Sequence, residues 1–130
     1  MAEHPDVETH RKGHDAFRSG DMDYLAEIIA EDAVWHWSGR SQISGDHVGR
    51  DAVFAAFGKI AELAGDTIEL EDHDFLGNDN HTVSLGTTRA SREGKSLEVN
   101  FVEVCHWRDG KVVEEWYIVE DQAAADEFWG

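Results

Sequence analysis

Hydrophobic positions recur at two spacings along the chain. In the first half, apolar residues return every three or four positions, which is typical of helices with one buried face. From residue 67 onward they alternate with polar residues, which predicts strands. We expect helices over residues 5–17, 22–32 and 50–65, a strand over residues 33–39, and strands over residues 67–77, 81–91, 95–107 and 111–120.

Local signals support these boundaries. Pro5 suits the first turn of a helix, Asp21 is a good N-cap, and Gly65 can end the third helix. The polar segment 39–49 is predicted to be a loop, and "QAAADEFW" a short final helix. Helices first and a meander of strands after them indicate one α+β domain over residues 1–130, with the helices on one side of a curved antiparallel sheet.

Charge narrows the range of partners. The chain has 28 acidic and 11 basic residues, a formal net charge of -17. Such a chain repels phosphate backbones and anionic lipid, so neither nucleic acid nor a membrane is an expected partner. No apolar run could span a bilayer, and residues 1–10 lack the features of a signal peptide. We therefore expect a cytoplasmic protein in which Cys105, the one cysteine, is a buried structural thiol.

The last hairpin places several acids among apolar residues. If Asp109 and Gly110 form its turn, Trp107 pairs with Val112, Cys105 with Glu114, Glu103 with Trp116, Phe101 with Ile118, and Val99 with Glu120. This aromatic-rich face is the better candidate for the concave side of the sheet. Glu103, Glu114 and Glu120 would then point inward and Glu115 outward.

An acid among aromatic side chains is a candidate for catalysis. Such a carboxyl loses hydration, and its pKa rises toward the range that general acid–base chemistry needs. Glu103 and Glu120 are the candidates, with Asp121 as the alternative to Glu120. The competing interpretations are that these acids lie at a sheet end or pair with an arginine such as Arg89, and that Asp121 only caps the final helix.

The histidines and tryptophans favour a pocket. His10 and His14 have the helical spacing of two metal ligands, but no clear third ligand accompanies them, so we expect no metal and place His14 in a pocket wall. Five tryptophans suit a cavity for a flat apolar ligand, and no cofactor motif is present. The expected ligand-binding residues are His14, Phe17, Trp35, Trp37, Phe57, Phe101, Trp116 and Ile118.

The order of elements resembles the cone-shaped fold of nuclear transport factor two, ketosteroid isomerase, scytalone dehydratase and the SnoaL-like polyketide cyclases. Three stretches carry the resemblance, "RSGDMDYLAEIIAEDAVWHW", "VGRDAV" and "WRDGKVVEEW". It implies a deep pocket for a small, largely apolar molecule. It does not imply a particular reaction, because folds host many functions.

Comparison with individual members assigns roles to several positions. Glu103 lies where ketosteroid isomerase has its oxyanion-holding acid, but Trp37 and Gly13 stand where that enzyme has its base and its tyrosine. In SnoaL-like cyclases an aspartate near the end of the last strand is the acid or base, a position that Glu120 or Asp121 could fill.

The leading hypothesis is therefore cofactor-free proton transfer on a small hydrophobic carbonyl compound, such as isomerisation, cyclisation or dehydration. The alternative is a non-catalytic ligand-binding or dimerisation module. An epoxide hydrolase is a third option, but its Asp-Arg-Asp arrangement is not evident. The resemblance also implies a homodimer, which we expect to form through the outer face of the sheet around Val102, Val104, Val113, Tyr117 and Val119.

Overall fold

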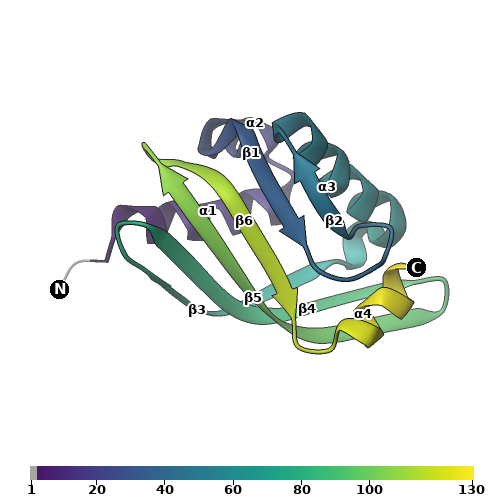
Figure 1. Cartoon of the computed structure of the whole chain (residues 1–130). Helices are drawn as coiled ribbons and strands as arrows, with labels where there is room; N and C mark the ends of the chain where they lie inside the picture. Colours follow the sequence, from purple (N-terminus) through teal and green to yellow (C-terminus); the bar gives the residue numbers. More distant parts are fainter. Residues whose placement is uncertain (1–2) are drawn as a thin grey trace.

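The computed structural model, which describes residues 3–130, is a curved sheet with helices against one face (Figure 1). Its elements in chain order are α1 (Pro5–Ser19), α2 (Met22–Ile28), β1 (Ile29–Trp37), β2 (Gly45–Val48), α3 (Arg50–Ala64), the short helix η1 (Gly65–Thr67), β3 (Glu69–Gly77), β4 (His81–Arg92), β5 (Lys95–Arg108), β6 (Lys111–Val119) and α4 (Gln122–Trp129).

The strand order is β2-β1-β6-β5-β4-β3. All neighbouring strands are antiparallel except β1 and β6, which run parallel. Helices α1, α2 and α3 lie on the concave side of the sheet, and α4 follows β6 at its end (Figure 1). The predicted α+β cone is confirmed. Its topology places β1, from the first third of the chain, directly against the last strand.

Two boundaries near the N-terminal end differ from the prediction. The second helix ends at Ile28, and Ile29 already has extended dihedral angles because it pairs with Val112 of β6. A short strand, β2, lies inside the expected loop and pairs with β1. In both places strand pairing outweighs the local preference of the sequence. The predicted N-cap is confirmed, since the Tyr24 backbone N–H donates to Asp21 at 3.1 Å.

The predicted register of the last hairpin is wrong beyond its first pair. Asp109 and Gly110 do form the turn, with φ of 52° and 77°, and Trp107 does pair with Val112. Then His106 pairs with Glu114, so Val113 is one extra residue on β6. Such a bulge exchanges the faces of all later residues of the strand.

The bulge reverses four inward predictions and three outward ones. Phe101, Glu103 and Cys105 face inward as expected. Their partners on β6 are Val119, Tyr117 and Glu115, respectively. The residues predicted inward that instead lie on the outer face are Glu114, Trp116, Ile118 and Glu120. Glu115 is buried, whereas half of Ile118 is exposed.

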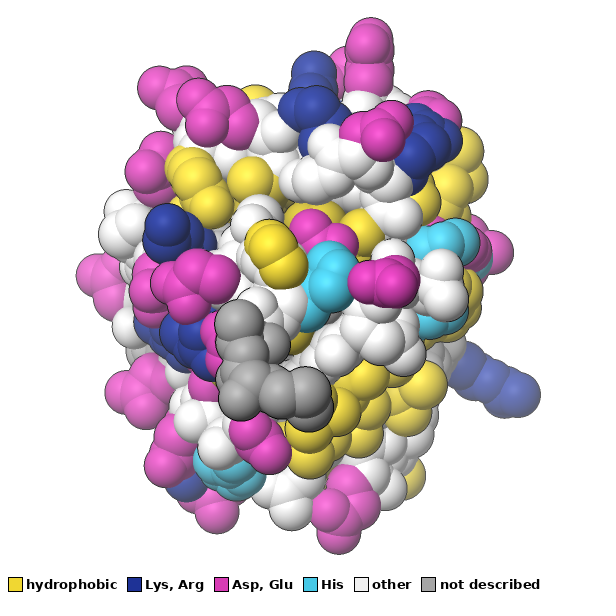
Figure 2. Space-filling model, turned by 90° about the vertical axis from the view of Figure 1, so that its left-hand side faces the viewer, with side chains coloured by type: hydrophobic (Ala, Val, Ile, Leu, Met, Phe, Trp, Pro, Cys, Tyr) yellow, Lys and Arg dark blue, Asp and Glu magenta, His cyan; other side chains and the backbone are white. Residues whose placement is uncertain are grey.

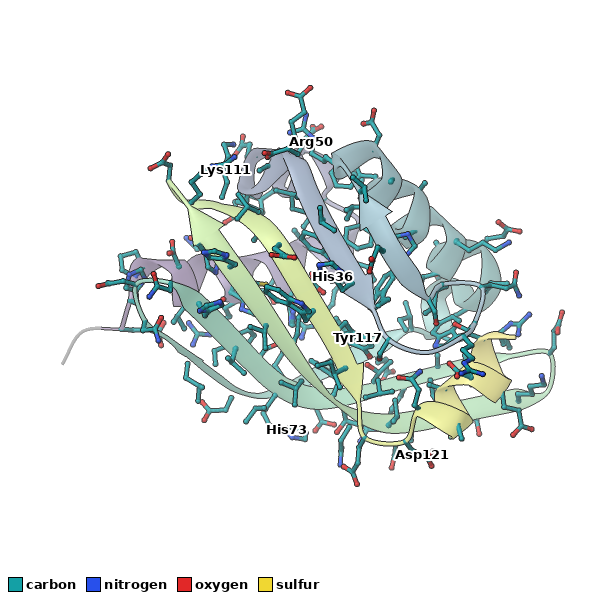
Figure 3. The ribbon with its side chains drawn as sticks, in the orientation of Figure 1. His36, Arg50, His73, Lys111, Tyr117 and Asp121 are labelled. Atoms are coloured by element: carbon teal, nitrogen blue, oxygen red, sulfur yellow. The ribbon has the colours of Figure 1, made fainter. Side chains whose placement is uncertain are left out.

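The outer face of the sheet still carries an apolar patch, which shares Val102 and Val104 with the predicted one. Tyr117 and Val119 point inward. The outer patch is formed by Leu85, Val102, Val104, Trp116 and Ile118, which pair across β4, β5 and β6. His36 of β1, labelled in Figure 3, lies beside this patch. Its ring stacks on that of Trp116, with centroids 5.5 Å apart.

Acidic side chains cover much of the remaining surface. Figure 2 shows them distributed around one side of the molecule, with hydrophobic side chains gathered below its centre. None of the helices in residues 3–130 combines the length and hydrophobicity that crossing a bilayer requires.

Candidate functional site

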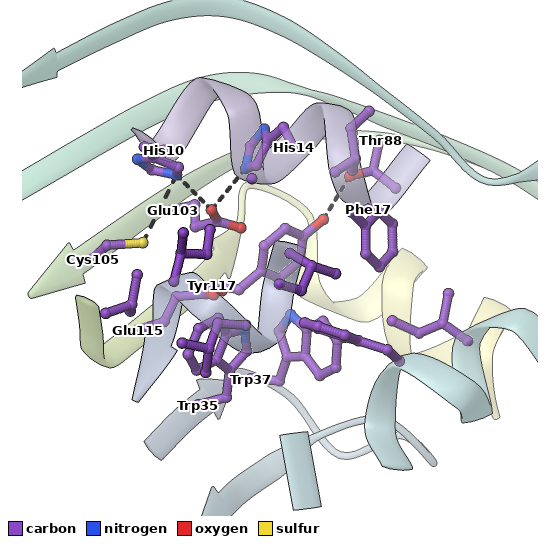
Figure 4. A pocket seen from close by; sticks show the side chains of 18 of the residues that line it. His10, His14, Phe17, Trp35, Trp37, Thr88, Glu103, Cys105, Glu115 and Tyr117 are labelled. Atoms are coloured by element: carbon purple, nitrogen blue, oxygen red, sulfur yellow. Dashed lines mark hydrogen bonds and ion pairs between the residues drawn. The ribbon is translucent and has the colours of Figure 1, made fainter. Parts of the chain in front are cut away.

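A cavity of about 90 Å³ lies between the concave face of the sheet and the helices. Its walls are almost entirely apolar, and its polar groups gather where α1 crosses β5 and β6 (Figure 4). An apolar cavity of roughly 150 Å³ holds benzene. The present space is smaller than that, so a ligand with one six-membered ring would fit only if the lining side chains moved apart.

Most of the predicted ligand-binding residues line this cavity. They are His14, Phe17, Trp35, Trp37 and Phe57. Phe101 is buried in the neighbouring core. Trp116 and Ile118 cannot reach the cavity, because the bulge at Val113 turns them to the outer face.

Helix α1 brings two histidines to the cavity from successive turns. His10 and His14 are four residues apart, which places them on one face of the helix. Helix α1 can approach α2 closely because Gly13 has no side chain. A Cβ atom at this position would lie 3.0 Å from Ile28 Cδ1 of α2. Both imidazole rings are buried and meet edge to face, with centroids 4.9 Å apart.

Glu103 of β5 is the centre of the polar network. Its Oε1 accepts from His10 Nε2 at 2.7 Å and from His14 Nε2 at 2.8 Å. His14 Nδ1 donates to Asp72 at 2.7 Å, and Arg18 also donates to Asp72. Because both of its nitrogens face carboxylates, His14 is held as an imidazolium between two acids.

His10 has a different set of partners. The Trp107 indole donates to Thr82 Oγ1 at 2.8 Å, and Thr82 lies 2.8 Å from His10 Nδ1. With its oxygen already accepting, the Thr82 hydroxyl can donate to Nδ1, which leaves the Nε2–H of His10 for Glu103. The hydrogen bonds then form one directed chain from Trp107 to Glu103.

The charges of this network reinforce one another. Burial opposes ionisation of Glu103, but the charge of His14 and the hydrogen bonds from both histidines outweigh it, and the pKa of Glu103 is lowered. Burial likewise opposes protonation of His14, yet Glu103 and Asp72 raise its pKa to about 10. Glu103 is thus a carboxylate at neutral pH, and His14 is positively charged.

Glu115 is the second acid of the cavity and has the opposite state. It is only 3% exposed, and a carboxyl oxygen lies within 4.8 Å of one from Glu103. Burial, followed by the charge of Glu103 and hydrogen bonding with it, raises the pKa of Glu115 well above its usual range. Glu115 therefore carries a proton at neutral pH, beside a carboxylate that does not.

Two further polar groups of the cavity wall are poor proton donors. The Tyr117 hydroxyl lies 2.6 Å from Thr88 Oγ1, and burial raises its pKa. Burial and the charges of Glu103 and Glu115 raise the pKa of the Cys105 thiol. This state agrees with the expected buried, unreactive thiol.

The other predicted catalytic acids lie elsewhere. Glu120 is exposed and accepts from Asn100 Nδ2 at 2.9 Å. Asp121 precedes α4 (Figure 3) and accepts from the Ala124 backbone N–H at 3.1 Å, as expected of an N-cap. The expectation that one of them opens into the cavity is wrong, because it depended on the register without a bulge.

The spacing of the histidine, carboxylate and thiol atoms can be compared with that of metal ligands. His10, His14 and Glu103 each present one atom within 4.8 Å of the others, and Glu103, Cys105 and Glu115 form a second such set. Ligand atoms around a tetrahedral zinc ion lie about 3.3 Å apart. The histidine nitrogens are closer to Glu103 than that and direct protons at it. A hydrogen-bonded network describes these atoms better than a ligand set does.

Comparison with known proteins agrees with this architecture. The family model for the SnoaL-like domain matches residues 10–115. The chain belongs to the SnoaL-like family. This fold commonly binds small molecules.

Similar chains cover nearly the whole length of this SnoaL-like protein. An uncharacterized protein of Mycobacterium tuberculosis is 28% identical over 99% of both chains. The structure of Bal32a, from a soil-derived mobile gene cassette, is 39% identical, with a TM-score of 0.93 over 96% of both chains. A protein of unknown function with a cystatin-like fold from Xanthomonas campestris is 28% identical, with a TM-score of 0.90 over 96% of this chain and 98% of the other.

Proposed function

We propose that this protein binds a small, largely apolar carbonyl compound and catalyses cofactor-free proton transfer on it. The observation that carries the proposal is the pair of acids at the polar end of an apolar cavity. Glu115 is protonated, Glu103 is ionised, and their carboxyl oxygens lie within 4.8 Å of each other. Two acids whose environments separate their pKa values form a common acid–base arrangement.

The two acids have distinct roles in this proposal. Glu115 donates its proton to an oxygen of the ligand, where negative charge develops. Glu103 receives a proton from the carbon next to the carbonyl group and is held in place by His10 and His14. The hydrogen bonds that lower the pKa of Glu103 also make it a weak base. Proton donation by Glu115 is therefore the larger contribution to the rate.

Dehydration of a β-hydroxy ketone illustrates the balance of the reaction. The hydrogen on the α-carbon passes to Glu103, and the hydroxyl group leaves with the Glu115 proton as water. The proton on Glu103 then crosses the short gap to Glu115, which restores both groups. Isomerisation and cyclisation would need the same two groups, with the proton returned to a different atom of the ligand.

The test uses β-hydroxycyclohexanone, whose dehydration gives a conjugated enone that absorbs in the ultraviolet. We expect Glu115→Gln to lower the rate by about 10²- to 10⁴-fold, because it removes the proton and keeps the shape. Glu114→Gln is the matched control, since Glu114 is the neighbouring acid on the outer face. Equal rates in Glu115→Gln and the unchanged protein would contradict the role of Glu115.

A non-catalytic ligand-binding module is the second candidate. It is favoured by the complete hydrogen bonding of both histidines, which also suits a purely structural network. Quenching of tryptophan fluorescence by cyclohexanone, with no turnover of the hydroxy ketone, would support this candidate instead.

A further inference from the structure

One buried hydrogen-bond donor in the cavity wall has no partner. The indole nitrogen of Trp37 is inaccessible to solvent and meets no acceptor among residues 3–130. The whole side chain is only 9% exposed and lines the cavity. Figure 4 shows the indole beneath Tyr117, on the wall opposite the histidines.

An unpartnered indole N–H is unusual in a folded protein. Buried tryptophans normally pair their N–H group, because leaving it unpaired forfeits the hydrogen bond that water would supply. Trp107 of the same cavity does so with Thr82. Since residues 3–130 offer no acceptor to the Trp37 N–H, a bound molecule could supply one.

The sheet places Trp37 two residues along β1 from Trp35, the residue that pairs with the acid Glu115. In the parallel ladder of β1 and β6, Trp35 is beside Glu115 and Trp37 is beside Tyr117. Two residues along a strand correspond to about 7 Å. The Tyr117 hydroxyl is already engaged with Thr88, so the Trp37 N–H is the open donor at this second position.

We propose that the Trp37 indole donates to a second oxygen of the ligand, at the end opposite the oxygen that meets Glu115. The inference rests on the proposed function and narrows its substrate class. The ligand is a single six-membered ring that carries oxygen acceptors on opposite sides, such as a cyclic dione or hydroxy ketone. The two-residue separation agrees with a molecule of this length.

Two probes that differ by one oxygen test the inference. Cyclohexanone has one acceptor, and the cyclohexane dione with carbonyl groups at opposite ring positions has two. We expect the unchanged protein to bind the dione about three- to tenfold more tightly, which is the effect of one neutral hydrogen bond. Trp37→Phe should remove this preference while leaving the affinity for cyclohexanone nearly unchanged.

Trp129→Phe is the matched control. Trp129 also lines the cavity, but its indole nitrogen is not a buried unpartnered atom. This variant should keep the preference for the dione. Trp37→Phe should slow the dehydration of β-hydroxycyclohexanone less than Glu115→Gln does, because it removes a contact to the ligand and leaves the acid in place.

A measurement on the unchanged protein avoids the question of whether Trp37→Phe folds. In a ¹⁵N-labelled sample, the dione should shift the Trp37 indole N–H signal downfield and slow its exchange with water, and cyclohexanone should do neither. Equal affinity for both probes, or an indole signal that the dione leaves unchanged, would show that the Trp37 N–H does not donate to the ligand. Failure of both ketones to bind would overturn the proposed function itself, and this inference with it.

Discussion

Glu114 and Glu115 are neighbours on β6, yet they lie on opposite faces of the sheet and in different environments. Glu114 is partly exposed and lies 2.6 Å from His36 Nε2, so its charge is met by water and by a partner. Burial, together with the neighbouring Glu103 carboxylate, raises the pKa of Glu115. The side of the sheet, and not the residue type, therefore decides which acid can carry a proton at neutral pH.

The same contrast between the two faces of the sheet extends to the histidines. On the inner face, His14 is enclosed by Asp72 and Glu103. On the outer face, His36 is more accessible between Asp46 and Glu114. Surface charge pairs contribute little to stability, whereas breaking a buried pair leaves a charge without compensation. Substitutions on the inner face should therefore lower the free energy of unfolding more than substitutions on the outer face do.

The largest effect is expected from Glu103→Ala. This change leaves the His14 imidazolium beside one carboxylate instead of two and leaves both Nε2 groups without their acceptor. We expect the free energy of unfolding to fall by about 3–5 kcal/mol in urea titrations. The control is Glu98→Ala on the same strand, which breaks an exposed pair with Arg89 and should cost less than about 1 kcal/mol. Equal losses in the two variants would refute the buried network.

A smaller effect is expected from pH. The folded protein raises the pKa of His14 from 6.5 to about 10, so the stabilisation from its charge is complete below pH 6.5 and is lost as the pH rises toward 10. The free energy of unfolding should decline over that interval, and His14→Gln should reduce the decline. His36→Gln is the outer-face comparison. The pKa of His36 is raised, chiefly by its hydrogen bond with Asp46, but its exposure should make the change in slope slight. The same slope in all three proteins would contradict the assignment to His14.

The smallest effect on folding is expected from the outer apolar patch, where we propose that a second copy of the chain binds. Sedimentation at micromolar concentration should give about twice the 14.6 kDa chain mass, with moderate salt screening the repulsion between two acidic subunits. Val104→Glu should favour the monomer and change the stability of the isolated chain by only about 0.5 kcal/mol. A single species of monomer mass for the unchanged protein would exclude this dimer.

The candidate site was only partly predictable. Glu103 and His14 follow from alternation along β5 and from helical spacing, and both reach the cavity. Asp72 and Thr82, which hold the two histidines, come from β3 and β4, and no local pattern connects them to α1. A signal for the bulge does exist. In "VVEEW", residues 112–116, two apolar residues and then two acids interrupt the alternation.

By itself, the sequence determined the order of the elements, the caps at Asp21 and Asp121, the hairpin turn at Asp109 and Gly110, and the α+β class. Each of these follows from interactions between residues close in the chain, so spacing and residue type are sufficient. Only the tertiary structure decided that Glu115 faces the cavity and that Trp37 lies beside Tyr117. The reason is that one extra residue on β6 reverses the faces of the strand, and the parallel pairing of β1 with β6 joins segments about 80 residues apart.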